Sequence, residues 1–493
     1  MRRAALLVAT AALATACGTT VPLSQQSSAL GTDPSGLGGD VVSSTTGGSA
    51  LGGTSGTTGG TTGASSLPGA SSSGSVVPGS TSTTTTGART PTTVPTAAVP
   101  RTTAPVKVGV LYIDGADQAA AALGIGLTTG DTKAQAKAII AALNAQGGLA
   151  GRKITPVLYG MNASDLSSNP SGVYQAACTS LAQDSKVSFV VSYVNPLASA
   201  IACFAKAKIP FLDDQSLLAD SVQKQYAAYF SAPGDFAPGR LMKNLVDGLW
   251  AQGWLTPKSK VGSYTFDTKE NIALVESALV PALAAHGLKI VKKAAVSSSV
   301  SGVSQSSNAS LQYRTAGVDR IIPVSANPLF VMQAASSQGY HPRYALYSSI
   351  GPGALLESAA PKDQLAGAAG IGWQPFLDIG AGTKPGPVSA NETRCFAIMK
   401  AAGQASSSAT VKGLQASLCD VLFFLKAAAD KVGGAPSDVI RRASPLIGAT
   451  FPSANTFRSD VSTRVDGAAG FRDLAYQQDC GCFQYVSGIH AAA

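Results

Sequence analysis

Several short apolar runs of the sequence end in side chains whose hydroxyl, carboxylate and carboxamide groups could bind a small polar solute. In an open α/β sheet, ligands bind beyond the carboxyl ends of the strands, where backbone N–H groups and helix N-termini point. If these runs are strands, the rule selects side chains that lie at or just after their ends. The candidate ligand contacts are Tyr112, Asp114, Ser192, Tyr193, Asn195, Asp213, Asp267, Ser325 and Asn327.

Each type of candidate also has a purely structural interpretation. Tyr112 and Tyr193 suit packing at the rim of a sheet as well as contact with a ligand. Asp213 and Asp267 suit the caps of the helices that follow them. Asn195 precedes a proline, which favours a turn. Residue types alone leave both interpretations open.

Residues that would support catalysis are few. The three histidines fall in no metal-binding or nucleophile motif, and the sequence contains no G-x-S-x-G, H-E-x-x-H or P-loop. The glycines of "GIGLTTG", at 124–130, do not form G-x-G-x-x-G. We therefore predict a protein that is not an enzyme, with no catalytic residue, metal or cofactor, and keep an extracellular hydrolase only as an alternative. The histidines are His286, His341 and His490.

The N-terminus has the pattern of an exported protein. Residues 1–17 combine two arginines, a short apolar segment and small residues, which predicts a signal peptide. Its end, "ATAC", resembles a bacterial lipobox, with Leu13 one place earlier than usual, and so implies a lipid anchor on Cys17 at the outer face of the membrane.

Residues 18–104 are rich in Gly, Ser, Thr and Pro without an aromatic side chain, which predicts a disordered linker. The net charge of +9 is spread along the chain, so we expect no nucleic acid partner.

Six cysteines follow Cys17, and an even number in an exported chain favours disulfides. The six cysteines form three groups of two along the sequence, and this proximity favours a disulfide within each group. A C-x-C metal site is the alternative for the last group, but no histidine lies near it. The favoured pairs are Cys178–Cys203, Cys395–Cys419 and Cys480–Cys482.

From residue 106 onwards, short apolar runs alternate with helical patterns. This order predicts right-handed βαβ units around a parallel sheet, and it begins again after residue 232, which predicts a second sheet. Residues 388–445 are expected to be mainly helical, followed by short strands and turns. The expected strands are 106–113, 154–160, 186–194, 209–213, 260–266, 288–296, 319–325 and 344–349.

The turn after the first helix carries a more specific pattern, "LNAQGGLAGRKI" at 143–154. Gly147 and Gly148 can end a helix in the left-handed conformation, and Gly151 permits the turn into the next strand. This stretch, together with the strand order, resembles the type I periplasmic binding protein family, especially its leucine/isoleucine/valine-binding branch. The resemblance covers about residues 105–485.

That resemblance implies two Rossmann-like lobes with parallel sheets, joined by a hinge of three crossovers. Lobe 1 would comprise 105–232 and 379–447, and lobe 2 would comprise 233–378 and 448–493. Trp373 would lie near the second crossover, either lining the cleft or packing in the hinge. In the family's amino-acid binders, hydroxyls after the third strand hold a carboxylate and a lobe 2 acid holds the ammonium group. Here Ser192 is kept, "SYVNPLASA" replaces the run of hydroxyls, and Asp267 is the candidate acid.

The resemblance also implies a function. It predicts an extracytoplasmic lipoprotein that captures an amino acid, an amide or a related small polar ligand between its lobes and delivers it to the permease subunits of an ABC importer. An aromatic or neutral polar ligand suits the tyrosines and asparagines equally well. The alternative from another class is a tethered interaction or sensor protein that kept the fold without transport.

Overall fold

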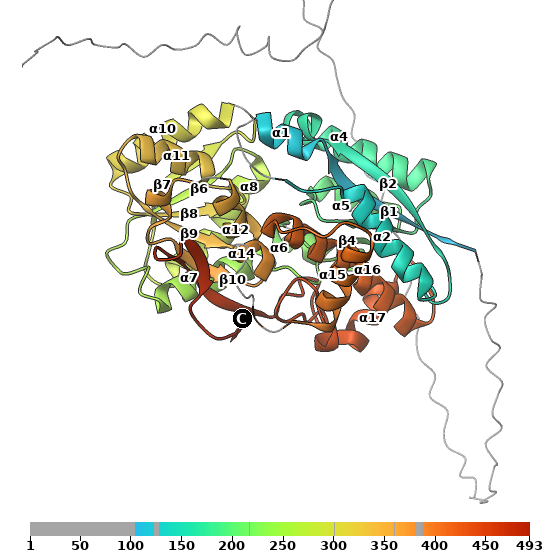
Figure 1. Ribbon diagram of the computed structural model, residues 1–493. Coiled ribbons are helices and arrows are strands. Elements are labelled where there is room, and N and C mark those ends of the chain that lie inside the picture. Colours follow the sequence, from blue (N-terminus) through green and yellow to red (C-terminus); the bar gives the residue numbers. More distant parts are fainter. Residues whose placement is uncertain are drawn as a thin grey trace, which may run out of the picture. The chain divides into compact units, whose positions relative to one another are not determined.

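The computed structural model describes residues 104–122, 128–215, 217–299, 301–358, 360–379, 386 and 388–493 (Figure 1). Every described element belongs to the part of the chain from Pro95 to Ala493. The predicted signal peptide, Cys17 and the predicted linker up to residue 103 lie outside the described residues.

The first sheet consists of five parallel strands in the order β2-β1-β3-β4-β5. Along β1, Val108 and Val110 pack in one apolar core and Leu111 packs in another, because successive side chains of a strand point to opposite faces. Both faces are therefore covered, as parallel sheets require. The strands are β1 (Val106–Asp114), β2 (Ile154–Asn162), β3 (Phe189–Ser192), β4 (Phe211–Asp213) and β5 (Phe230–Ser231).

Helices from two separate parts of the chain cover this sheet. One face carries α2 (Thr132–Ala145) together with the later helices α15 (Ala390–Ala401), α16 (Ala409–Val432) and α17 (Val439–Ile447). The other face carries α4 (Pro170–Cys178), which runs on as a π-helical segment over Thr179–Asp184, and α5 (Ala198–Lys206). We call this sheet and its helices lobe 1.

The second sheet has five parallel strands, β7-β6-β8-β9-β10, extended by antiparallel strands that come from the C-terminal segment. Its core is one large cluster that includes Leu245 of α7 (Pro238–Ala251) and Met332 of α11 (Leu329–Ser337). We call this sheet and its helices lobe 2. The strands are β6 (Val261–Phe266), β7 (Ile290–Val296), β8 (Arg320–Val324), β9 (Arg343–Tyr347), β10 (Ala369–Gly372), β11 (Gly470–Gln477), β12 (Cys482–Tyr485) and β13 (His490–Ala491).

The remaining helices flank one of the two lobes or lie close to the segments that connect them. They include α10 and β10's neighbour α14, which the sequence analysis had not assigned. Their bounds are α1 (Ala116–Ala122), α3 (Ala163–Ser168), α6 (Asp220–Gln225), α8 (Lys269–Leu274) with a π-helical segment to Leu279, α9 (Val280–Ala284), α10 (Ser301–Ala316), α12 (Pro352–Glu357), α13 (Lys362–Leu365) and α14 (Pro375–Asp378).

Three crossovers connect the lobes: β5 to α7, β10 to α15, and α17 to β11. In the third crossover, Phe451 and Val461 still pack in the lobe 1 core, and Ala468 is the first residue in the lobe 2 core. The structure thus places the passage between lobes later than the expected boundary after residue 447, because these apolar side chains are covered by lobe 1 helices. The two-sheet fold predicted from the sequence is confirmed.

All three favoured disulfides are present. Cys178 and Cys203 join α4 to α5 on one face of the first sheet, and Cys395 and Cys419 join α15 to α16 on the other. Each bond therefore ties together two helices that cover the same face. The third bond, Cys480–Cys482, closes the turn between β11 and β12.

Candidate ligand-binding site

A polar hollow of about 270 Å³ lies at the carboxyl end of β1, which we call the lobe 1 hollow. It contains two sequence candidates, Tyr112 and Asp114. The carboxylate of Asp114 is 3.6 Å from Nζ of Lys133, and that ammonium group is 5.3 Å from the centre of the Tyr112 ring. The lining residues are Tyr112 to Gln118 and Thr129 to Lys133.

Tyr193 reaches the wall of this hollow from the end of β3. Its hydroxyl lies 3.0 Å from Oγ1 of Thr132, the first residue of α2. Burial raises the pKa of Tyr193, so its hydroxyl stays protonated and remains available as a hydrogen-bond donor. The structure thus brings Tyr112, Asp114 and Tyr193 together.

The loop opposite Asp114 is fixed by Asp117. Its carboxylate accepts hydrogen bonds from Oγ1 of Thr128 at 2.9 Å, and from the backbone N and Oγ1 of Thr129, both at 2.7 Å. Partial burial opposes ionisation of Asp117, but these hydrogen bonds outweigh it and lower its pKa. The hollow therefore has a preformed, charged wall.

The other lobe 1 candidates hold the backbone of their own loops. Oγ of Ser192 bonds both N and O of Val194, and Ser192 is fully buried. Oδ1 of Asp213, also fully buried, accepts from the backbone N of Asp214 at 2.8 Å. The side chain of Asn195 is exposed, and its Oδ1 accepts from the backbone N of Leu217 at 2.8 Å. Ser192 and Asp213 thus hold their own loops, and Asp213 does not cap the following helix, α6, which begins at Asp220.

A second hollow, of about 240 Å³, lies at the carboxyl ends of β6, β7 and β8, and we call it the lobe 2 hollow. Its walls combine aromatic rings with a row of serines. Asn327 lines it, with Nδ2 donating to the carbonyl of Ile350 at 3.2 Å. The lining residues are Tyr264, Phe266, Ser297, Ser298, Ser299, Gly302, Asn327, Leu329, Phe330, Ala354 and Ser358.

The remaining lobe 2 candidates lie outside this lining. Ser325 stands two residues before Asn327 with a φ of 63°, a left-handed conformation that non-glycine residues rarely adopt. Asp267 is exposed just after β6 and is absent from the lining of the hollow. The structure does not bring Asp267 together with the other candidates.

Trp373 packs in the hinge. It is fully buried, its indole N–H donates to the carbonyl of Gly234 at 3.2 Å, and its ring meets that of Phe236 edge-on at 4.8 Å. A ligand cannot reach a side chain enclosed in this way, so the structure favours the hinge-packing interpretation over cleft lining.

The same hinge contains five fully buried carboxyl groups, which we call the hinge acids: Asp213, Asp214, Asp235, Asp378 and Asp420. Asp214 accepts from Nδ2 of Asn455 at 2.7 Å, and Asp378 accepts from the Tyr485 hydroxyl at 2.6 Å. Burial raises the pKa of Asp378 and of Asp420 to about 7, and it raises the pKa of Asp213 and Asp214 well above the ordinary range. Asp214 is thus held to the third crossover, and Asp378 of the second crossover is held to β12.

The comparisons with known proteins are informative only at the level of structure. No family model matches the sequence, and no curated protein matches it. A type 1 periplasmic binding protein from Bordetella pertussis Tohama I is 13% identical, with 78% of this chain and 99% of that chain covered and a TM-score of 0.57. The chain has the type I periplasmic binding protein fold.

Two further solved structures share this fold. The branched-chain amino acid transporter substrate-binding protein LivJ from Streptococcus pneumoniae, in complex with isoleucine, is 15% identical, with 79% and 99% of the two chains covered and a TM-score of 0.54. A solute-binding protein of an ABC transporter from R. palustris, in complex with 4-hydroxybenzoate, is 15% identical, with 79% and 97% covered and a TM-score of 0.57. The fold predicted by resemblance is thereby confirmed.

The sequence analysis missed some residues that line the lobe 1 hollow and some that line the lobe 2 hollow. Thr129 lies in the segment 124–130, which was considered only as a phosphate-binding glycine motif, and Lys133 was not singled out. Asp131 caps α2 by accepting from the backbone N of Ala134. A helix cap that follows a strand-end loop could have indicated that the adjoining residues face the same hollow. Phe266 was predicted at the end of a strand, beside the candidate Asp267, and Phe330 was not singled out.

Two other findings concern the described residues. Within them, no helix is long and apolar enough to cross a membrane. No group of three or more His, Cys, Asp or Glu side chains in that part of the chain could hold a metal ion. None of the three histidines lines either hollow.

Proposed function

We propose that this protein is an extracytoplasmic solute-binding protein that captures one small polar ligand between its two lobes for an ABC importer. The observation that supports this proposal is that each lobe has its own hollow at the carboxyl ends of its parallel strands. Three crossovers connect the lobes, so closure about them can bring both hollows onto one solute. The ligand then stabilises the closed population by its greater affinity for that state.

The chemistry of the hollows indicates the kind of ligand. The lobe 1 hollow offers carboxylates, an ammonium group and hydroxyls, whereas the lobe 2 hollow combines aromatic rings with serine hydroxyls. A ligand with one charged or polar end and a compact apolar or aromatic body fits both. Amino acids, amides and aromatic acids have this form. The solved structures of the same fold with isoleucine and with 4-hydroxybenzoate contain ligands of this kind.

We further propose that the protein is held at the outer face of the membrane by lipid on Cys17, and that residues 18–104 let the lobes sample the solvent. The signal-like N-terminus and the lipobox-like cysteine support this location. Mass spectrometry of the native N-terminus should find acyl groups on Cys17, and an unmodified Cys17 would contradict the anchor.

A thermal-shift screen of amino acids, amides and aromatic acids tests the function. A true ligand at 100 times its Kd adds about 2.7 kcal/mol of stability. Lys133→Gln in the lobe 1 hollow and Phe330→Ala in the lobe 2 hollow should each reduce that gain. Lys137→Gln and Leu311→Ala, at exposed positions of α2 and α10, are the matched controls and should leave it unchanged.

The outcome separates the proposal from its alternative. If no solute in the screen raises the melting temperature, the tethered interaction or sensor protein becomes the better account. If a solute binds and only the lobe 2 variant weakens it, capture between the two lobes is contradicted.

A further inference from the structure

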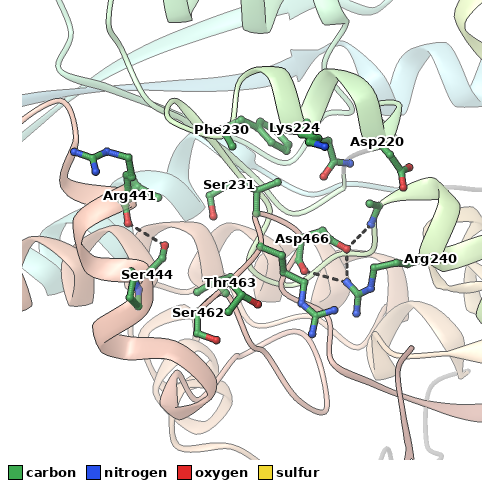
Figure 2. Close-up of a pocket in the computed structure, with 18 residues that line it drawn as sticks. Asp220, Lys224, Phe230, Ser231, Arg240, Arg441, Ser444, Ser462, Thr463 and Asp466 are labelled. Carbon is green, nitrogen blue, oxygen red and sulfur yellow. Dashed lines mark hydrogen bonds and ion pairs between the residues drawn. The ribbon is translucent and has the colours of Figure 1, made fainter.

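A groove of about 470 Å³, separate from both hollows, lies where the first and third crossovers run side by side. The backbone N of Ala232 donates to the carbonyl of Val465 at 2.7 Å, and the backbone N of Gly467 donates to the carbonyl of Ala232 at 2.8 Å. Helix α17 of lobe 1 forms one side and α7 of lobe 2 forms the other, as Arg441 and Arg240 show in Figure 2. We call this space the hinge-side groove.

The lining of the hinge-side groove includes several apolar side chains. Phe230 and Val461 are each only 1% exposed, because most of their surface packs in the lobe 1 cores. Small-molecule sites of about 300 to 1,000 Å³ have such apolar walls with a few polar groups. The apolar lining residues are Ala227, Phe230, Ala237, Ile440, Pro445, Val461 and Val465.

Basic side chains outnumber acidic ones around this groove: Lys224, Arg240, Arg441 and Arg464 against Asp220 and Asp466. Two of the four basic groups are already bound. Arg240 holds the carboxylate of Asp466, and its Nη2 donates to the carbonyl of Ala468 at 2.9 Å. Arg441 pairs with Asp438 at 3.0 Å.

The acidic groups are bound as well. Oδ2 of Asp466 also accepts from the backbone N of Ala237 at 3.0 Å, and Oδ1 of Asp220 accepts from the backbone N of Gly239 at 2.8 Å. Near the rim, Asp460 accepts from N and Oγ of Ser462, and the positive charges of Arg464 and Arg240 help to lower its pKa. The carboxylates around the groove are therefore already bound to backbone N–H groups and to Arg240.

Two basic groups remain uncommitted in the part of the chain that the structure describes. Lys224 makes no ion pair there, and the Nε–H of Arg464 is buried without a hydrogen-bond partner among the described residues. An anion in the groove would bring negative charge and acceptor oxygens beside both basic groups.

We propose that the hinge-side groove binds a small, free amphipathic carboxylate, whose charged end meets Lys224 and Arg464 and whose hydrocarbon part lies along Ala227, Pro445 and Val465. This site differs from the proposed solute site because it uses neither hollow. A ligand here would contact both lobes and two crossovers at once.

Isothermal titration of the mature chain with octanoate, octan-1-ol and octylammonium tests the proposal. Octanoate should bind, and the neutral and cationic probes should bind at least about tenfold more weakly, as expected for loss of charge-assisted contacts. The double variant Lys224→Gln, Arg464→Gln should weaken octanoate by about tenfold or more. Ala227→Trp should block the groove, and since Ala227 and Lys224 are exposed, these changes leave the core intact.

Two controls distinguish this site from others. Lys258→Gln removes an exposed charge outside the groove, and Lys133→Gln alters the lobe 1 hollow, so both should bind octanoate like the unaltered protein. Equal binding of octanol and octanoate, no binding of octanoate, or loss of binding in Lys133→Gln would each overturn the proposal. The last result would place octanoate in the solute site instead.

Discussion

At the scale of single residues, the stretch "LNAQGGLAGRKI" shows how a few side chains fix the first βαβ unit. Asn144 bonds both ways with Ile154: its Nδ2 donates to the carbonyl at 2.9 Å and its Oδ1 accepts from the backbone N at 2.7 Å. Gly148 and Gly151 have φ values of 64° and 84°, which reverse the chain between α2 and β2. The asparagine thus aligns the end of the helix with the start of the strand.

The two glycines differ in a way that can be tested. A Cβ on Gly148 would lie 2.0 Å from the carbonyl oxygen of Arg152, whereas a Cβ on Gly151 would meet nothing within 4 Å. Gly151→Ala should therefore lose only about 1–2 kcal/mol for the left-handed backbone. Gly148→Ala should lose clearly more, because the backbone must also move. Urea unfolding measures both, and equal losses would contradict the geometry.

The candidate site could be predicted only in part at this scale. Tyr112 and Asp114 were found because the carboxyl end of a strand fixes their place. For Ser192, Asp213 and Asp267 the strand end was also found, but whether a side chain turns into a hollow or onto its own backbone depends on tertiary contacts. Trp373 illustrates the same limit, because its burial follows from Phe236 and Gly234, which are distant in sequence.

At the scale of elements, the N-terminus of α16 is capped from the other lobe. The carboxylate of Glu357, at the end of α12, accepts from the backbone N of Ala409 at 2.6 Å, Oγ1 of Thr410 at 2.7 Å and Oγ of Ser408 at 3.0 Å. A negative charge is favourable there because unpaired N–H groups and the helix dipole make this end positive. One carboxylate thus joins lobe 2 to the longest helix of lobe 1.

Neutralising this cap should lower stability. Glu357→Gln keeps the size of the side chain but removes the charge and one acceptor oxygen, and we expect a loss of about 1–2 kcal/mol in urea unfolding. Glu276→Gln is the contrast, because Glu276 forms an exposed ion pair with Lys293, and such surface pairs contribute little. A larger loss of unfolding free energy for Glu276→Gln than for Glu357→Gln would mean that the cap across the lobes contributes no more than a surface ion pair.

The elements themselves were largely predictable, since strands such as β1 and β8 are continuous apolar runs. The failures have physical causes. Helix α10 buries Ser306 and Ser310 rather than an apolar stripe, so it lacks the expected periodicity. Strand β10 is four residues long, "AGIG", and two of them are glycines. The antiparallel pairing of β11 with β10 joins segments about 100 residues apart, which local patterns cannot indicate.

At the scale of the whole molecule, the three crossovers share the buried network of the hinge acids. Gln374 of the second crossover donates through Nε2 to the carbonyls of Asp214 and Gly234. Asn455 of the third crossover bonds Asp214 and Ser417, the latter at 2.9 Å. Stability of the hinge therefore depends on carboxyl groups whose pKa is raised by burial.

The pH dependence of stability should follow from this network, and Asp378 provides the test. Its pKa rises from 3.8 to about 7 on folding, so the folded protein retains a proton that the unfolded chain has already lost at intermediate pH. The stability from this group is fully present below about pH 4 and is lost as the pH rises towards 7.

The side chain of the Asp378→Asn variant cannot ionise, so the stability of this variant should fall less than that of the unaltered protein between pH 5 and pH 8.

Tyr485→Phe should have the opposite effect on the pH dependence of stability. The Tyr485 hydroxyl donates to Oδ2 of Asp378 and lowers its pKa, so removing the hydroxyl raises that pKa further and extends the loss to higher pH. Urea unfolding at both pH values measures these changes. In an Asp378→Asn background, Tyr485→Phe should leave the pH dependence unchanged, because the group it acts on no longer titrates. An undiminished pH dependence in Asp378→Asn would show that the proton on Asp378 does not stabilise the hinge.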